Sequence, residues 1–289
     1  MHGTNDAVEQ RLELEGGGLA LVRWGAEEAS PVLCLHGWLD NANSFAPIAP
    51  YLPEVCLLAL DLPGHGRSDH RPAGVGYHYL DWVVDVVEAA DRLGLSRFSL
   101  MGHSMGAGIA ALVAGTVPER VDRLVMLEGA GPRSTSAGQV PTLLADYVAG
   151  RTAARAVRRP GRGSAFATAV RARLAYADPL SDHSAELLCR RAVVQAPQGG
   201  VVFGNDRRLQ RAMPRMLSSE AIVAFFARIA CPALLVVASE GLGRRAGISE
   251  DRLAAIADLT HVEVPGGHHV HMDCPEVVAE HLRRFLIGA

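Results

Sequence analysis

The pattern of apolar and polar positions divides the chain into short apolar runs separated by helical segments. Most of the runs lack the alternation of a half-exposed strand, which is typical of strands buried on both faces of a sheet. Two runs near the N-terminus flank Gly16-Gly17-Gly18 and predict a hairpin. The expected strands are Leu12–Glu15, Leu19–Trp24, Pro31–Leu35, Glu54–Leu60, Phe98–Met101, Leu124–Leu127, Ala233–Ala238 and His261–Val264.

Helical patterns alternate with these strands. Tyr77–Leu93 is amphipathic and ends at Gly94, and the other helices are expected at Ala107–Thr116, Ser249–Ala257 and Pro275–Leu286. This alternation predicts an α/β fold: a mostly parallel eight-stranded sheet flanked by helices, with right-handed crossovers. In such a sheet, functional groups gather at the carboxyl ends of the strands.

Between Pro132 and Ile229 the strand pattern fades and helical patterns replace it, at Thr142–Val148, Ser164–Tyr176, Ser184–Val194 and Ser219–Ile229. Prolines and the pair Gly199-Gly200 interrupt them. We therefore expect a core in two parts, 1–131 and 230–289, separated by a helical insertion over 132–229 that lies above the sheet edge.

The composition excludes several classes of protein. The chain has 289 residues, 49% of them hydrophobic, which is enough for a sizeable core. Its apolar runs are too short to span a membrane, and its first residues do not resemble a signal peptide. Five scattered cysteines without a CxxC pair argue against a disulfide framework or a zinc site, and predict a cytoplasmic protein.

The charge is unevenly distributed. All 28 basic residues are arginines and the net charge is −3, but residues 132–229 contain 15 arginines and only 6 acidic residues. Such a segment could attract anionic substrates. Because the arginines are spread over almost the whole segment, we interpret them as solvated helix faces, and we expect no nucleic-acid partner.

The segment Gly102-His103-Ser104-Met105-Gly106 lies between an expected strand and an expected helix. Gly-x-Ser-x-Gly in that context is the pattern of a nucleophile elbow, in which a strained turn exposes the serine hydroxyl. Ser104 is therefore the candidate nucleophile. It shares the carboxyl edge of the predicted sheet with His36, Asp61 and Glu128.

A serine nucleophile needs a base and an acid that orients the base. The loop after the last strand contains His268, His269 and His271, and we expect His268 to be the base because it is nearest the strand end. The other two are expected to pack or form hydrogen bonds around it. With no second cluster at ligand spacing, we expect no metal, and no cofactor either.

The acid has two candidates. Glu128 ends the strand that follows the elbow helix, and Glu240 follows the first strand after the insertion. Glu240 precedes His268 by a number of residues that suits a triad acid. However, the acid is expected about one residue further along the chain. Glu128 would be a costly buried charge unless a histidine paired with it. The residues alone leave both open.

An oxyanion hole needs two backbone donors. We expect the N–H of Met105, directly after the nucleophile, and the N–H of Trp38, in the loop after the Pro31–Leu35 strand. His36, in the same loop, is expected to brace it rather than to transfer protons.

With these motifs in order, the chain resembles the α/β-hydrolase superfamily along nearly all of its length. The matching stretches are His36-Gly37-Trp38, Asp61-Leu62-Pro63-Gly64-His65-Gly66-Arg67-Ser68, Gly102-His103-Ser104-Met105-Gly106 and Gly267-His268. Within this superfamily the chain resembles the serine hydrolase-like subgroup. Three sequence segments carry this resemblance: His36-Gly37-Trp38-Leu39-Asp40-Asn41, the stretch 264–272 and Asn205-Asp206-Arg207-Arg208-Leu209.

The resemblance implies an acid at the position of Glu128, which favours that residue over Glu240. It also implies a helical cap over the site, with Met213, Met216, Phe225 and Phe226 as candidate pocket-lining residues; ordinary packing within the cap is the alternative. A serine at the elbow argues against haloalkane dehalogenases and epoxide hydrolases, which have an aspartate there.

We therefore expect a serine hydrolase that cleaves a carboxylic ester or thioester of a small molecule through an acyl-enzyme. C–C bond hydrolases, lactonases and cofactor-free perhydrolases use the same residues. A non-catalytic sensor that keeps the hydrolase pocket is the alternative of another class. The sequence indicates neither the acyl group nor the oligomeric state.

Overall fold

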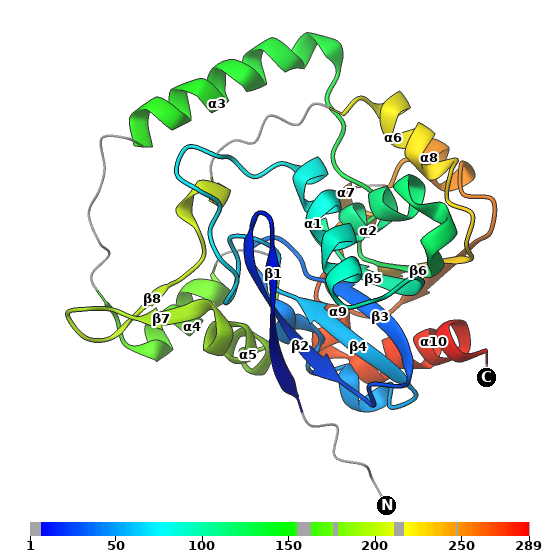
Figure 1. Cartoon of the computed structure of the whole chain (residues 1–289), viewed down its shortest axis with the longest axis horizontal. Helices are drawn as coiled ribbons and strands as arrows, with labels where there is room; N and C mark the ends of the chain where they lie inside the picture. The colour runs from blue at the N-terminus through cyan, green and yellow to red at the C-terminus, as the bar shows by residue number, and fades with distance from the viewer. Residues whose placement is uncertain (1–6, 155–162, 176–178, 211–216, 247, 289) are drawn as a thin grey trace, which may run out of the picture.

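The computed structural model describes residues 7–154, 163–175, 179–210, 217–246 and 248–288. Its centre is one eight-stranded sheet (Figure 1), in the order β1-β2-β4-β3-β5-β6-β9-β10. The strands are β1 (Val8–Leu14), β2 (Gly17–Trp24), β3 (Ser30–Leu35), β4 (Val55–Leu60), β5 (Phe98–His103), β6 (Val121–Leu127), β9 (Ala233–Ala238) and β10 (Leu259–Val264). All eight expected strands are present, so the predicted sheet is confirmed.

The sheet is parallel except at one edge. β1 and β2 form the expected hairpin, and β2 runs antiparallel to β4; every later pairing is parallel. β4, β5 and β9 are buried along their whole length, which explains their continuous apolar sequences. The parallel strands bring the residues that follow them to one edge of the sheet.

Helices cover both faces of the sheet. α1 (Tyr79–Arg92), α2 (Met105–Thr116) and α6 (Ser219–Phe226) contribute to the hydrophobic cluster on one face. The short helices η1 (Ala42–Phe45) and η2 (Ala49–Tyr51) and the C-terminal α10 (Pro275–Ile287) contribute to the cluster on the other. Shorter elements are η3 (Pro118–Arg120), α7 (Leu242–Ala246), α8 (Glu250–Ala254) and α9 (Val270–Asp273).

The segment between β6 and β9 is mainly helical, as expected. It contains η4 (Ala137–Gln139), α3 (Val140–Ala154), α4 (Phe166–Leu174), α5 (Asp182–Ala192), η5 (Arg207–Gln210) and α6. It also contains a small antiparallel pair, β7 (Val193–Gln195) and β8 (Val201–Phe203), where the sequence predicted only the end of a helix. In Figure 1, α3 crosses the top of the view, while α4, α5 and the small pair lie together at the lower left.

None of the described helices is both long and apolar enough to cross a membrane. All five cysteines are free thiols, and four of them are buried.

Candidate active site

Ser104 connects β5 to α2 in a strained turn. Its φ of 52° and ψ of −110° lie outside the region that a serine ordinarily adopts, and its N–H donates to the Leu127 carbonyl at 2.8 Å. The turn leaves no room for side chains on the helix side: a Cβ at Gly106 would overlap the carbonyl oxygen of Leu35. Ser104 itself is half-buried. The sequence folds here as the nucleophile-elbow pattern predicts.

Glu128 and His268 lie side by side. Glu128 directly follows β6, is almost fully buried, and places Oε2 at 3.0 Å from His268 Nδ1. Its carboxylate also accepts the N–H of Ala238 on Oε1 at 2.5 Å and the N–H of Gly243 on Oε2 at 3.2 Å. Backbone N–H groups can only donate, so both of these hydrogen bonds end on the carboxylate oxygens, and the contact with His268 Nδ1 is the third polar contact of this carboxylate.

The loop after β9 wraps around this carboxylate. A Cβ at Gly241 would overlap the Glu128 side chain, so only glycine allows the approach. Glu240, the other candidate acid, comes one residue earlier; its side chain is exposed and its N–H donates to the Gly266 carbonyl. The structure thus brings Glu128 to His268 and leaves Glu240 at the surface.

The His268 loop rests against the serine turn through His103. The ring centroids of His103 and His268 are 4.8 Å apart, and His103 Nε2 donates to the His268 carbonyl at 2.9 Å. Since His103 immediately precedes Ser104, this contact joins the His268 loop to the turn that carries the candidate nucleophile.

The two candidate oxyanion donors lie in the turn after β5 and in the loop after β3. Met105 is the first residue of α2, so its N–H has no acceptor within the helix. Trp38 lies in the loop after β3, and the residue after it, Leu39, has a φ of 61°. That loop approaches the first turn of α2 at Gly106. The Trp38 indole packs edge-on against His65, with ring centroids 6.2 Å apart.

His36 joins the loops after β3 and β4. Its Nδ1 donates to the Gly37 carbonyl at 2.7 Å, and its Nε2 accepts the Leu62 N–H at 3.0 Å. An imidazole that accepts a backbone N–H must be neutral, and burial accordingly lowers the pKa of His36. His36 therefore braces the loop, as the sequence predicted.

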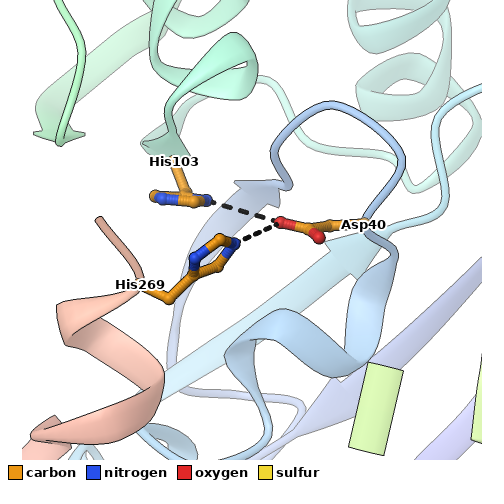
Figure 2. Close-up of side chains that lie close together, drawn as sticks. All are labelled: Asp40, His103 and His269. Atoms are coloured by element: carbon orange, nitrogen blue, oxygen red, sulfur yellow. Dashed lines mark hydrogen bonds and ion pairs between the residues drawn. The ribbon is translucent and has the colours of Figure 1, made fainter. Parts of the chain in front are cut away.

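A buried ionic cluster, which the sequence did not predict, includes His269 of the same loop (Figure 2). Asp40 faces His269 Nε2 at 3.3 Å and His103 Nδ1 at 3.7 Å. These three residues offer ligand atoms within 4.8 Å of one another, as a metal site would. Arg173 of α4, however, places Nη2 at 2.6 Å from Asp40 Oδ1 and already supplies a positive charge, so the cluster fits an ion pair better than a metal.

The positive groups around Asp40 affect its pKa more strongly than its burial does. Burial by itself would raise the pKa of Asp40, but the contacts with His269 and with the Arg173 guanidinium hold it well below its usual range. For His103, burial and the neighbouring histidines lower the pKa well below the ordinary value. The sequence contained Asp40 in a family motif but gave no sign of its partner Arg173, 133 residues away.

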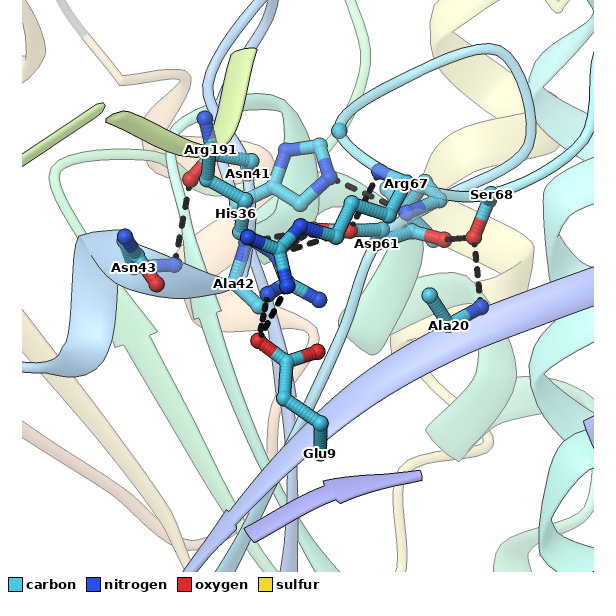
Figure 3. A network of polar contacts seen from close by, with 12 residues as sticks. Glu9, Ala20, His36, Asn41, Ala42, Asn43, Asp61, Arg67, Ser68 and Arg191 are labelled. Atoms are coloured by element: carbon cyan, nitrogen blue, oxygen red, sulfur yellow. Dashed lines mark hydrogen bonds and ion pairs between the residues drawn. The ribbon is translucent and has the colours of Figure 1, made fainter. Parts of the chain in front are cut away.

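A second arginine of the insertion enters the core at Asp61 (Figure 3). Arg191 of α5 is almost fully buried, and its Nε lies 3.0 and 2.8 Å from the two Asp61 carboxylate oxygens. Asp61 also accepts the backbone N–H groups of Ala42 and Arg67. Asp61, which directly follows β4, thus anchors three segments and is not in contact with His268 in the described part of the chain.

The stretch 205–209 makes the third set of contacts between the insertion and the strand-end loops. Asn205 Nδ2 donates to the Leu39 carbonyl at 3.2 Å, and its Oδ1 accepts the Gly66 N–H at 3.3 Å. Asp206 accepts the Tyr77 hydroxyl at 2.8 Å. These contacts support the loop that carries Trp38.

Two of the four candidate pocket-lining residues lie in the described part of the chain. Phe226 is fully buried in the hydrophobic cluster with α2, and Phe225 packs against the same cluster, because α6 lies against α2. These two residues therefore show the ordinary packing that the sequence analysis gave as the alternative to lining a pocket. Met213 and Met216 lie outside the described residues.

Comparison with known proteins agrees with this architecture. Residues 30–275 match the family model of the alpha/beta hydrolase fold. The zebrafish (Danio rerio) "Serine hydrolase-like protein" is 33% identical over 97% of this chain and 88% of its own length. The human "Serine hydrolase-like protein 2" is 31% identical over 96% of this chain and 93% of its own.

Solved structures give the same result. A hypothetical protein from Pseudomonas aeruginosa PAO1 is 36% identical, covers 97% of this chain and 98% of its own, and has a TM-score of 0.88. The thioesterase domain from the curacin biosynthetic pathway is 27% identical, covers 96% and 99%, and has a TM-score of 0.76. The chain belongs to the α/β-hydrolase family, and its similarity to serine hydrolase-like proteins marks it as a hydrolase.

Proposed function

We propose that this chain is a serine hydrolase that cleaves a carboxylic ester or thioester through an acyl-enzyme. The observation that carries the proposal is the buried hydrogen bond between Glu128 and His268, on a loop that contacts the strained turn of Ser104. An ionised carboxylate that receives Nδ1–H fixes the tautomer, so the lone pair of the imidazole is on Nε2.

The reaction follows from that tautomer. His268 Nε2 takes the proton of Ser104 as its oxygen attacks the substrate carbonyl, and the imidazolium formed is stabilised by Glu128. The N–H groups of Met105 and Trp38 stabilise the oxyanion. The tetrahedral intermediate collapses, and His268 gives its proton to the leaving alcohol or thiol. Water then attacks the acyl-enzyme with the same base, releasing the acid and free Ser104.

The insertion over 132–229 is proposed to act as a cap on this site. Arg173 of α4, Arg191 of α5 and Asn205 each contact the loops that follow β3 or β4, the same loops that carry Trp38 and Asp61. Substrate choice would then depend on the insertion as much as on the strand ends. We place the protein in the cytoplasm, where five free thiols are stable.

Activity-based labelling tests the mechanism. A fluorophosphonate should label the wild-type chain at Ser104 and fail to label Ser104→Ala, and hydrolysis of p-nitrophenyl esters by that variant should fall by about 10⁴-fold or more. A panel of acyl lengths, with thioesters and lactones in parallel, identifies the bond cleaved. The similarity to a thioesterase domain is the reason to include thioesters. Ester hydrolysis that survives Ser104→Ala unchanged would contradict the proposal.

The panel also separates the rival functions. C–C bond hydrolases, lactonases and cofactor-free perhydrolases would label at Ser104 but prefer other substrates. A sensor that keeps the pocket without an activated hydroxyl would bind small molecules and would not react with the fluorophosphonate.

A further inference from the structure

Three segments that are distant in the sequence meet at the carboxylate of Asp40, which is itself almost fully buried. The loop after β3 supplies Asp40, the insertion helix α4 supplies Arg173, and the loop after β10 supplies His269. Arg173 Nη2 binds Asp40 Oδ1 at 2.6 Å, and His269 Nε2 faces Oδ2 at 3.3 Å. Each carboxylate oxygen is therefore engaged by a different segment.

His269 is the residue next to His268, so whatever fixes its ring also fixes the backbone of the base. His269 Nε2 lies 3.3 Å from both Asp40 Oδ2 and Arg173 Nη2; it donates to the first or accepts from the second, and either hydrogen bond fixes the ring. On the other side, His103 Nε2 holds the His268 carbonyl. Within the described residues, the ring of the base has its hydrogen bond to Glu128 and packs against the rings of His103 and His269. The orientation of its Nε2 thus depends on supports outside the Ser104, His268 and Glu128 set.

Of the residues that hold the His268 loop, Arg173 is the one that comes from the insertion. It uses one nitrogen, Nη2, for both contacts, while its Nε and Nη1 are buried with no partner in the described part of the chain. Removing the guanidinium would leave Asp40 Oδ1 buried and unpaired, a state that is costly unless the loop rearranges. Asp40 also contacts His269, so a change at Asp40 reaches the segment that carries His269 and His268.

We infer that Asp40 and Arg173 are positioning residues for the His268 loop, so that the insertion helix α4 completes the support of the base. The inference rests on the proposed hydrolase function. Neither residue touches the reacting atoms, and both act by holding His269. Correct placement of a base within about 1 Å is worth roughly 100-fold in rate, which sets the size of the expected effect.

The test is Arg173→Met with Arg71→Met as its matched control. Arg71 is as buried as Arg173 and pairs with Asp85 of α1 at 2.5 Å, in an ion pair that does not include the His268 loop. Ester hydrolysis is measured as kcat and KM per active serine, titrated to completion with a fluorophosphonate, so that unfolded protein does not lower kcat. Thermal unfolding of both variants is recorded by circular dichroism.

Arg173→Met should lower kcat by about 10–100-fold and leave KM within about threefold, since the lost interaction orients the base rather than binding substrate. Arg71→Met should lose comparable thermal stability and keep kcat within about twofold. Arg173→Lys, which retains one cationic nitrogen, should recover part of the lost kcat, and Asp40→Asn should reproduce the loss.

Equal kcat values for Arg173→Met and Arg71→Met, or a loss confined to KM, would overturn the inference. If Arg173→Met does not fold, Arg173→Gln and Arg173→Lys are compared in the same assay, and equal kcat values for the two would also overturn it. Failure of the proposed function is a separate result: the wild-type chain would then not be labelled at Ser104 at all.

Discussion

Three histidines within four residues contact three different parts of the fold. His268 bonds Glu128 after β6, His269 faces Asp40 after β3, and His271 places Nε2 at 2.8 Å from the hydroxyl of Ser44 in η1. Their residue type and their position in the sequence are nearly the same. What distinguishes their chemistry is the group that each one meets across the fold, 140 to 229 positions away.

Glu128→Gln and Glu240→Gln test which carboxylate orients the base. The glutamine amide at 128 would keep its acceptor oxygen or its donor nitrogen toward His268, but not the charge that stabilises the imidazolium. We expect kcat to fall by about 10³–10⁴-fold for Glu128→Gln, as when a triad acid is lost. Glu240 is exposed, so kcat for Glu240→Gln should stay within about twofold of the wild-type value.

The readout is kcat on the best ester of the panel, with circular dichroism to show that both variants fold. The opposite order of effects would make Glu240 the acid and leave the Glu128 contact as a support of the loop.

At the scale of elements, the strands were predictable because burial on both faces leaves a continuous apolar sequence, as in β4 and β9. The β7–β8 pair was missed although its signal was present: Val193-Val194-Gln195 and Val201-Val202-Phe203 flank a turn with Pro197 and Gly199-Gly200. The apolar pattern of α5 continues into Val193, so the helical interpretation ran past the true helix end. For short apolar runs, periodicity does not separate helix from strand.

Only part of the candidate site could be predicted from the sequence. The turn at Ser104 has a local pattern, because steric limits act on neighbouring residues. The contact of Arg173 with Asp40 has none, because α4 meets the loop after β3 only in the folded chain. No local property of an arginine in an amphipathic helix distinguishes a buried ion pair from a solvated one.

Arg191→Met tests how α5 is held. The substitution keeps the apolar length of the side chain and leaves Asp61 buried without its cation, which we expect to cost about 3–5 kcal/mol of unfolding free energy. Arg244→Met breaks the exposed pair with Glu263 and should cost less than about 1 kcal/mol. Urea unfolding measures both. Equal effects would mean that the Arg191 pair contributes no more than a surface one.

At the scale of the whole molecule, part of the uneven charge distribution serves to hold the insertion to the core. We interpreted the arginines of 132–229 as solvated helix faces, but Arg173 and Arg191 are buried and Arg208 is bonded to Asp206. The first two pair with aspartates of the core, Asp40 and Asp61. Part of the positive charge of the insertion therefore balances negative charge at the sheet edge and attaches one to the other.

The buried histidines make the stability of the whole chain depend on pH. Burial lowers the pKa of His65 and of His271 from the ordinary value of 6.5 to about 3. A histidine with a lowered folded pKa binds its proton more strongly in the unfolded chain. The stability is thus fully present above pH 6.5 and is lost as the pH falls toward 3.

His65→Phe tests this dependence. The ring of His65 packs among the rings of His36, Trp38 and Trp82, so phenylalanine keeps the packing and removes the proton site. Between pH 6 and about 4, the free energy of unfolding of the wild-type chain should fall more steeply than that of the variant, by about 1.4 kcal/mol per pH unit. His261→Gln, at an exposed position, is the control and should leave the slope unchanged. Urea unfolding at a series of pH values gives the slopes, and parallel slopes for His65→Phe and the wild-type chain would show that His65 takes up a proton without unfolding.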